Sequence, residues 1–289
     1  MDMLYDAAII GTGPAGLSAA VNLKLHNKTV LWLGSREMST KIEKSEKIRN
    51  YPGFPEITGE ELNLRLREHA RAMELSVTDR VVTNVMPFGD AWMILAQSEF
   101  YKARTLLLAT GVSGEKGFSG ERELLGRGVS YCATCDGMLY QGKTIAVFCK
   151  SRKYEHEAAD LAGIVKTVWF YPAYPDPELD RPNVKRLEKP IRRVIGEERV
   201  RELELCGGER IAVDGLFCLR DSVAPETLVP GLVLDGPHIV VNRRQETSLP
   251  GCFAAGDCTG RPYQIAKAVG EGNIAAHGML EKLAADQKS

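Results

Sequence analysis

The sequence predicts an α/β fold in which buried strands end at ligand-binding turns, and three observations support this prediction. A glycine-rich turn near residue 11 joins an apolar run to a helical pattern. Two further apolar runs, at 106–111 and 249–257, end in small or acidic residues. The length of 289 residues is enough for about two domains.

Composition and charge are those of an ordinary globular protein, with 44% hydrophobic and 26% charged residues. The formal net charge of -1 gives no overall attraction to nucleic acid or to a membrane. No stretch approaches the roughly 18 apolar residues of a membrane span, and no secretory signal is visible. We therefore expect a cytoplasmic protein. The 7 cysteines do not favour a full disulfide framework, because their number is odd and a chain of this size needs no stapling.

The first turn has the pattern of a dinucleotide-binding loop. Residues 6–10 form an apolar run, residues 17–25 have helical apolar spacing, and residues 29–33 resume a strand. The first glycine permits a tight turn, the second lets a pyrophosphate approach the backbone, and the third lets helix and strand pack closely. The helix N-terminus offers N–H groups to the phosphates. The residues of this predicted site are Gly11, Gly13, Pro14, Ala15 and Gly16.

One element of the dinucleotide pattern is missing. The acidic residue expected about 20 residues further on is replaced by Gly34 and Ser35, and Glu37 is displaced by a few positions. We therefore expect the ribose to be recognised by another residue.

The two later apolar runs extend the site. The strand at 106–111 ends in Ala109, Thr110 and Gly111. The run at 249–257 ends in Gly256 and Asp257, which places a carboxylate at the carboxyl end of a strand, where ligands bind in open α/β sheets. Taken alone, Asp257 is as easily a helix N-cap.

Cys132 and Cys135 are separated by two residues and followed by Asp136. Such a pair can form a reversible disulfide when its thiolates are activated, and the adjacent carboxylate can transfer a proton during exchange. The alternatives are half of a zinc site or two inert thiols. A zinc site needs a second ligand pair, for which Cys252 and Cys258 are a poor substitute, so we expect no metal.

Together these motifs resemble those of the low-molecular-weight thioredoxin reductases. They occur in the same order as in that family, and the resemblance extends over nearly the whole chain. The resemblance rests on Gly11–Gly16, Ala109–Gly111, Cys132–Asp136 and Phe253–Asp257. It implies two Rossmann-like domains, each a three-layer β/β/α nucleotide-binding fold, the second inserted in the first. The FAD-binding domain would comprise residues 1–113 and 242–289, and the redox-active disulfide domain residues 114–241. It also implies that the chain forms a homodimer and that thioredoxin is the protein that it reduces.

The resemblance implies roles for single residues. Cys135 would face the flavin, Cys132 would attack the disulfide of thioredoxin, and Asp136 would be the general acid. Asp257 would bind the ribityl chain of FAD, and Gln264 and Ile265 would meet the isoalloxazine edge. The implied FAD contacts are Gly11, Gly13, Pro14, Ala15, Gly16, Asn50, Ala109, Thr110, Gly111, Gly256, Asp257, Gln264 and Ile265.

A second nucleotide site is expected in the inserted domain but its motif is absent. The strand at 143–148 leads into residues 149–158, which contain no glycine, so side chains would block the approach of a pyrophosphate. The next strand, 167–171, leads into a proline-rich segment without the basic pair that binds a 2′-phosphate. The sequence therefore predicts no use of NADPH. A divergent phosphate site is the alternative, built on Lys150, Arg152 and Lys153.

The resemblance therefore narrows to the ferredoxin-dependent flavin thioredoxin reductases, which lack nicotinamide motifs. A flavin can accept single electrons and pass on a pair, and the transfer runs downhill from about −400 mV for plant-type ferredoxins to about −270 mV for thioredoxin. Ferredoxins are usually acidic, so we expect a basic docking face, although glutamates are interleaved with its cations. The candidates are Arg36, Lys41, Lys44, Lys47 and Arg49.

Two other readings stay open: a reductase that uses NADPH or a second flavin, and a flavin-binding redox sensor without turnover. Two departures also affect the expected flavin contacts. The chain has Ser39–Ile42 where the NADPH enzymes have Gly-Gly-Gln-Leu, and Tyr263 where they have arginine.

Overall fold

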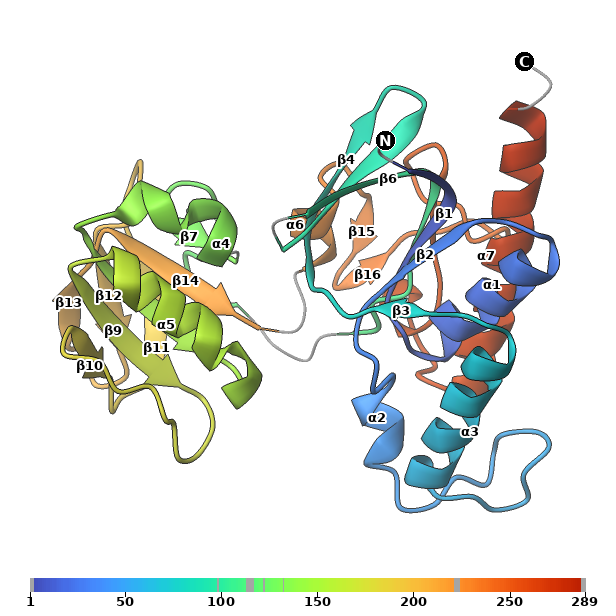
Figure 1. Ribbon diagram of the computed structural model, residues 1–289, viewed down its shortest axis with the longest axis horizontal. Helices are drawn as coiled ribbons and strands as arrows, with labels where there is room; N and C mark the ends of the chain where they lie inside the picture. Colours follow the sequence, from blue (N-terminus) through green and yellow to red (C-terminus); the bar gives the residue numbers. More distant parts are fainter. Residues whose placement is uncertain are drawn as a thin grey trace. The chain divides into compact units, whose positions relative to one another are not determined.

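The computed structural model describes residues 3–97, 99–112, 117–121, 123–131, 133–220 and 224–286. The chain forms two compact units (Figure 1). Unit 1 comprises Met1–Ser113 and Ala224–Ser289, and unit 2 comprises Gly114–Val223. Both are α/β structures, so the predicted fold class is confirmed.

The chain returns to unit 1 earlier than expected, at Ala224 instead of residue 242. Tertiary contacts explain the difference. Helix α6 (Pro225–Leu228) contacts a strand of unit 1, and the short hairpin β15 (Leu234–Asp235) and β16 (His238–Ile239) contacts the turn that contains Asp257. These elements are too short to show a periodic pattern in the sequence.

Unit 1 is built on a seven-stranded sheet with the order β3-β2-β1-β6-β5-β4, in which β17 also pairs with β6. Strands β3, β2, β1, β6 and β17 run parallel, whereas β4 and β5 continue the sheet antiparallel to β6. The strands are β1 Leu4–Ile10, β2 Val30–Leu33, β3 Val77–Thr78, β4 Val82–Phe88, β5 Ala91–Ala96, β6 Glu99–Leu108 and β17 Cys252–Ala254.

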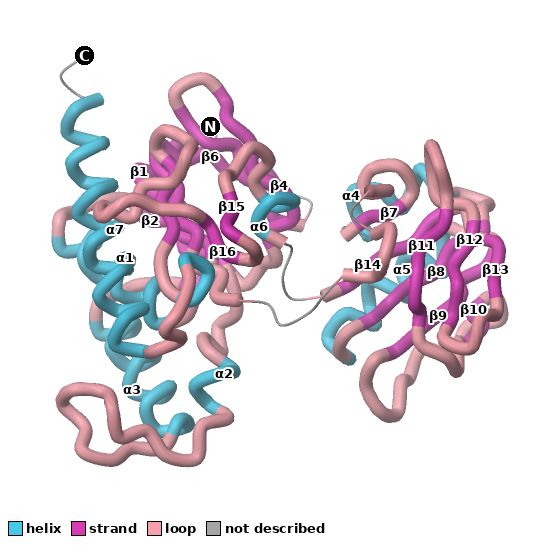
Figure 2. Tube along the Cα trace, turned by 180° about the vertical axis from the view of Figure 1, so that it is seen from behind, coloured by secondary structure: helices cyan, strands magenta, loops and turns pink. Residues whose placement is uncertain are grey.

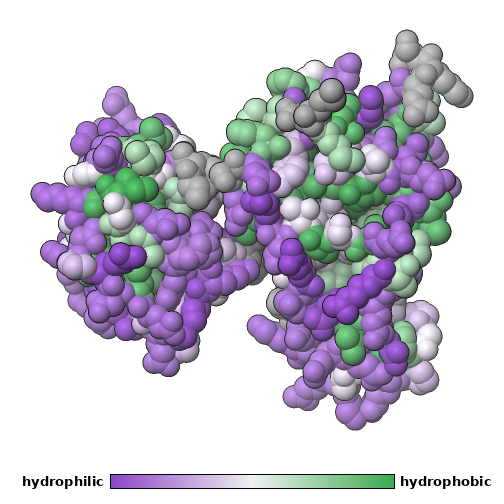
Figure 3. Space-filling view, in the orientation of Figure 1, coloured by the Kyte–Doolittle hydropathy of each residue, from purple (hydrophilic) through white to green (hydrophobic). Residues whose placement is uncertain are grey.

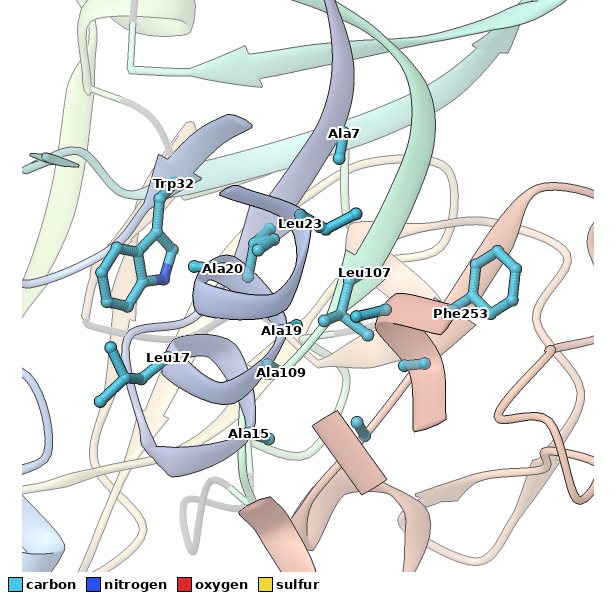
Figure 4. Close-up of a cluster of buried hydrophobic side chains, with 14 of the residues drawn as sticks. Ala7, Ala15, Leu17, Ala19, Ala20, Leu23, Trp32, Leu107, Ala109 and Phe253 are labelled. Carbon is cyan, nitrogen blue, oxygen red and sulfur yellow. The ribbon is translucent and has the colours of Figure 1, made fainter. Parts of the chain in front are cut away.

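Helix α1 (Pro14–Leu25) packs beside the long helix α7 (Ile265–Asp286), as Figures 1 and 2 both show. Unit 1 also contains α2 (Thr40–Glu43), α3 (Gly59–Ala72) and the short helix η3 (Asp257–Thr259). The core between sheet and helices contains Leu23, Trp32, Leu107 and Phe253, all at most 1% exposed (Figure 4). Small side chains of α1 lie in the same cluster and let helix and sheet approach closely.

Unit 2 has three layers. A parallel sheet with the order β10-β9-β8-β14-β7 carries α5 (Glu155–Ile164), and a three-stranded antiparallel sheet, β11-β12-β13, shares a core with its strands (Figure 2). This is the predicted β/β/α arrangement. The remaining elements are β7 Val129–Ser130, α4 Ala133–Asp136, η1 Gly137–Tyr140, β8 Thr144–Cys149, η2 Arg152–Tyr154, β9 Thr167–Pro172, β10 Val184–Arg186, β11 Ile191–Ile195, β12 Glu202–Leu205, β13 Arg210–Ala212 and β14 Gly215–Leu219.

The surface is largely hydrophilic on the face that Figure 3 shows, with apolar side chains in scattered groups. None of the helices among the described residues has both the length and the apolar character needed to cross a membrane.

Candidate active site

The turn between β1 and α1 is built for close backbone approach. Gly11 has φ +115, and a Cβ there would lie 2.1 Å from the carbonyl oxygen of Ala109. A Cβ at Gly16 would lie 2.0 Å from the Gly11 carbonyl oxygen, so both positions require glycine. Gly13 differs, because its Cβ would meet nothing within 4 Å. The backbone at Gly13 therefore borders open space. In dinucleotide-binding loops the second glycine is where the pyrophosphate approaches the backbone.

The N-terminus of α1 suits an anion. Gly13 is its N-cap, Pro14 stands in the first turn, and no side chain of the described part of the chain caps this end. The first turn also contains no acidic residue. The unpaired N–H groups and positive partial charge of the helix end are therefore available to a phosphate. The indole Nε1 of Trp32 donates to the Gly11 carbonyl oxygen at 2.9 Å and fixes the turn from the second strand.

The three predicted FAD segments meet at one edge of the sheet of unit 1. Strands β1, β6 and β17 run parallel as neighbours, so their carboxyl ends come together. The backbone N–H of Ala109 donates to Ile10 at 2.8 Å, and a Cβ at Gly256 would touch Ala15 at 3.1 Å. Gly111 has φ +68 and open space around it. Backbone with little side-chain cover therefore surrounds the α1 N-terminus, a cradle that fits a dinucleotide.

A partly buried ion pair between Lys267 and Glu271 braces the turn that carries Asp257. Lys267 Nζ donates to the carbonyl oxygens of Gly256 and Gly260, both at 2.9 Å. Glu271 Oε2 accepts from Lys267 at 3.0 Å and from the Gly256 N–H at 2.9 Å. Both side chains are only 17% exposed and lie one turn apart on α7. Sequence reasoning missed this pair, although its i,i+4 spacing was visible.

Lys41 has a different environment from the one expected for a docking cation. Its Nζ donates to the carbonyl oxygen of Val112 at 2.7 Å and lies 3.7 Å from the carboxylate of Asp257. It thus places a positive charge at the predicted flavin site. Lys41 belongs to the Ser39–Ile42 segment, which differs from the Gly-Gly-Gln-Leu of the NADPH enzymes.

The residues expected at the isoalloxazine edge are also brought together. Asn50 Nδ2 donates to Gln264 Oε1 at 2.5 Å, although the two residues are far apart in sequence. Ile265 packs against the apolar cluster that contains Ile42 and Ile57. Tyr263 is 41% exposed, and its hydroxyl lies 2.7 Å from His238 Nε2.

Glu37, the displaced acidic residue, is engaged elsewhere. Its Oε2 accepts from Arg67 at 2.6 Å, so its carboxylate is held by a neighbour on α3. Recognition of the ribose by a different residue stays a prediction.

The segment that contains the predicted redox pair follows β7 in unit 2. Cys132 lies outside the described residues, and of Cys135 only the backbone is described, within α4. Asp136 is partly buried and accepts a hydrogen bond of 2.6 Å from Ser130 Oγ. The hydroxyl fixes the orientation of the predicted general acid. Among the described residues, no group of three potential ligands could hold a metal ion.

The other five cysteines are free, and four of them are buried. Burial raises the pKa of Cys149 and Cys258 to about 11 and that of Cys252 to about 12. Burial also raises the pKa of Cys218. These thiols are poor nucleophiles at neutral pH, as expected for packing residues, whereas Cys206 is exposed.

The turn after β8, where a second nucleotide would bind, is filled by side chains of the chain itself. The carboxylate of Glu155, in the first turn of α5, accepts from the Tyr174 hydroxyl at 2.6 Å and from the Glu178 N–H at 3.0 Å. A carboxylate at a helix N-terminus occupies the position and repels the charge of a phosphate. Arg152 is bound to Glu178, and Lys153 lies over the Tyr154 ring at 4.9 Å.

The comparisons with known proteins agree with this geometry. Residues 5–149 match the model of the family described as pyridine nucleotide-disulphide oxidoreductase. The thioredoxin reductase of Bacillus subtilis is 32% identical, over 96% of this chain and 94% of its own length. A crystal structure of a ferredoxin-flavin thioredoxin reductase from Clostridium acetobutylicum is 39% identical, covers 100% of both chains and has a TM-score of 0.90. A thioredoxin reductase structure from Gloeobacter violaceus is 28% identical, with 99% and 96% coverage and a TM-score of 0.79.

Proposed function

Since the chain belongs to the pyridine nucleotide-disulphide oxidoreductases, and within them to the thioredoxin reductases, we propose that it takes its electrons from reduced ferredoxin. The electrons would pass through FAD to the Cys132–Cys135 disulfide and on to thioredoxin. The observation that carries the choice of donor is the turn after β8, where Glu155 stands at the helix end that a nicotinamide dinucleotide needs. The likeness to the ferredoxin-flavin enzyme supports the same donor.

FAD would be held in unit 1 by this backbone cradle. Gly13, which has open space around its Cα, and the uncapped N-terminus of α1 would hold the pyrophosphate, and Asp257 would accept hydrogen bonds from the ribityl hydroxyls. The remaining contacts that we assign to FAD are Gly11, Pro14, Ala15, Gly16, Asn50, Ala109, Thr110, Gly111, Gly256, Gln264 and Ile265. When bound, FAD supplies the conversion between single-electron and two-electron transfer.

The dithiol then reduces thioredoxin by exchange. The thiolate of Cys132 attacks one sulfur of the thioredoxin disulfide, which gives a mixed disulfide and releases a thiolate that takes a proton. The thiolate of Cys135 next attacks Cys132 Sγ, which re-forms the Cys132–Cys135 disulfide and releases the second thioredoxin thiol. Asp136, oriented by Ser130, supplies and accepts the protons.

An anaerobic reduction experiment tests the donor. Reduced ferredoxin should bleach the flavin absorbance rapidly, and NADPH should leave it unchanged. Rapid bleaching by NADPH alone would overturn the proposal and favour a divergent site on Lys150, Arg152 and Lys153. Bleaching by ferredoxin without turnover of thioredoxin would indicate a redox sensor.

A cysteine substitution tests the path after the flavin. Cys135→Ser should abolish thioredoxin reduction and leave the reduction of the flavin by ferredoxin intact. Thioredoxin reduction that survives this change would show that another thiol carries the reaction.

The homodimer implied by the resemblance stays a prediction, which sedimentation of the purified protein can test.

A further inference from the structure

Unit 2 contains an ion pair that is almost completely buried. Arg220 bonds to Glu121, and their side chains are 7% and 4% exposed. Two further donors reach the same carboxylate: the Tyr131 hydroxyl at 2.6 Å and the Phe118 backbone N–H at 2.8 Å. Glu121 therefore has three partners, and its charge is well satisfied.

The guanidinium of Arg220 is held by aromatic rings. Its central carbon lies 5.9, 5.3 and 5.7 Å from the ring centres of Phe118, Tyr131 and Phe148. Its Nε is buried and has no hydrogen-bond partner among the residues that the structure describes. The arginine has thus left water without recovering all of its hydrogen bonds, which is unfavourable for stability.

A buried ion pair of this kind is weak evidence for a stabilising role. Apolar residues of similar volume are often as stable as such a pair, or more stable, because the desolvation of two charges offsets their attraction. The alternative reason for a buried pair is that it fixes one arrangement of the chain.

The location of the pair indicates what it fixes. Phe118 and Glu121 follow the crossing from unit 1 to unit 2, and Arg220 precedes the crossing back. Tyr131 immediately precedes Cys132. Strands β7 and β14 run parallel as neighbours, with Ser130 opposite Phe217, which brings Tyr131 and Arg220 to the same edge of the sheet.

We propose that Arg220 and Glu121 are positioning residues of the disulfide exchange, acting through Tyr131 on the segment that carries Cys132 and Cys135. This inference rests on the proposed function of that cysteine pair. Two consecutive residues before Cys132 are tied: Ser130 to Asp136 and Tyr131 to Glu121. Burial and the neighbouring Glu121 raise the pKa of Tyr131, so its hydroxyl stays a donor at neutral pH. The position of the dithiol segment then depends on the ion pair.

Tyr131→Phe removes only the hydroxyl that links the segment to Glu121. We expect the protein to stay folded and the KM for thioredoxin to change little, because the ring and the ion pair remain, while the melting temperature falls through the loss of one hydrogen bond to a buried carboxylate. The kcat should fall roughly tenfold to a hundredfold, the effect of a small misplacement of reacting groups. Tyr171→Phe is the matched control, since Tyr171 packs against the same core without a hydroxyl contact in the described part of the chain, and it should leave kcat unchanged.

A double variant separates positioning from stability. Glu121→Gln with Arg220→Met removes both charges together, so no unpaired charge is left buried, and the protein should fold. Its equilibrium constant for exchange with thioredoxin should change roughly tenfold, which corresponds to about 30 mV in the potential of the disulfide. The control is Arg192→Met with Glu204→Gln, an ion pair of 3.1 Å whose arginine is 66% exposed.

The outcomes distinguish this inference from the proposed function. If the wild-type protein fails to reduce thioredoxin, the proposed function is wrong. If the wild type turns over, and Tyr131→Phe and the folded double variant both retain its kcat and its disulfide potential, the pair is only structural and the inference is wrong.

Discussion

Gly11 and Gly13 stand two residues apart in one turn, yet the structure gives them different tasks. Gly11→Ala would place a Cβ 2.1 Å from a backbone oxygen, at φ +115. We expect the free energy of unfolding of the apoprotein to fall by about 2 to 4 kcal/mol, measured by urea denaturation, because backbone strain and overpacking add.

Gly13→Ala is the matched variant. Its Cβ has open space and its φ is -73, so the unfolding free energy should stay within about 1 kcal/mol of the wild type. The methyl group would instead fill the space that we assign to the pyrophosphate. FAD affinity, measured by fluorescence on reconstitution, should therefore fall at least roughly tenfold. Unchanged FAD affinity in Gly13→Ala would contradict the assigned cradle.

The buried thiols give a prediction about pH. Burial raises the pKa of Cys149 and Cys258 to about 11, above the unfolded value of about 8.5, so both thiols stay protonated in the folded protein at pH 8. Iodoacetamide at pH 8 should label Cys206, which is exposed, and leave these two unlabelled until the protein unfolds. Mass spectrometry of the peptides measures the difference.

The sign of the pH effect on stability follows from the same shifts. A folded pKa above the unfolded value stabilises the native state below about pH 8.5, and this contribution is lost as the pH rises through 11. The unfolding free energy should therefore fall between pH 8 and about 11. A rise over this range would show that these thiols do not ionise as described.

Residue-level reasoning from the sequence singled out the glycines and Asp257 as FAD contacts because their types fit a known chemistry at a fixed spacing. It named Lys41 as a candidate docking cation and did not foresee that this lysine lies beside Asp257. It also missed Glu121 and Arg220, which are far apart in the chain and meet only in the folded unit. Such long-range pairs leave no local pattern.

At the level of elements, the order of apolar runs and the glycine-rich turn was sufficient. The strand–turn–helix from β1 to α1 and the long final helix α7 are confirmed. The first was recognisable because an apolar run, a Gly-x-Gly-x-x-Gly turn and a helix-forming segment follow one another in the sequence. The short elements α6, β15 and β16 are stabilised by tertiary contacts, which is why the second domain boundary was expected at residue 242 and lies at Ala224.

Helix α7 gives a prediction of its own, because it braces the Asp257 turn through Lys267. Lys267→Met removes the hydrogen bonds to Gly256 and Gly260 and leaves the half-buried Glu271 without its cation. We expect FAD to bind roughly tenfold more weakly, which equals about 1.4 kcal/mol, because the turn is no longer held in one position.

Lys282, which lies nearer the C-terminal end of α7, serves as the control for Lys267. Lys282 makes an exposed ion pair with Asp286 on the same helix, far from the Asp257 turn in sequence. Lys282→Met should leave the dissociation constant of FAD unchanged, as measured by equilibrium titration. Equal weakening by both substitutions would mean that α7 acts through its general stability.

For the whole molecule, the near-neutral net charge of -1 means that docking of the proposed electron donor, an acidic ferredoxin, would depend on local cations. Of the candidates, Lys47 and Arg49 share the carboxylate of Glu56, and Lys41 lies at Asp257. Lys44 is exposed and makes no ion pair within the described residues. Arg36 is likewise exposed and makes no ion pair within that part of the chain, so these two residues are the available cations among the candidates.

Lys44→Glu should slow the reduction of the flavin by ferredoxin roughly three- to tenfold at low ionic strength, measured by stopped-flow absorbance. The difference should shrink in about 0.5 M salt, since screening then acts within a few ångströms. Reduction by dithionite, which needs no docking, should be unaffected. Lys166→Glu, at an exposed lysine of unit 2, is the control and should match the wild type. Equal slowing by both variants would mean that overall charge steers ferredoxin, and no effect of either would place the docking surface elsewhere.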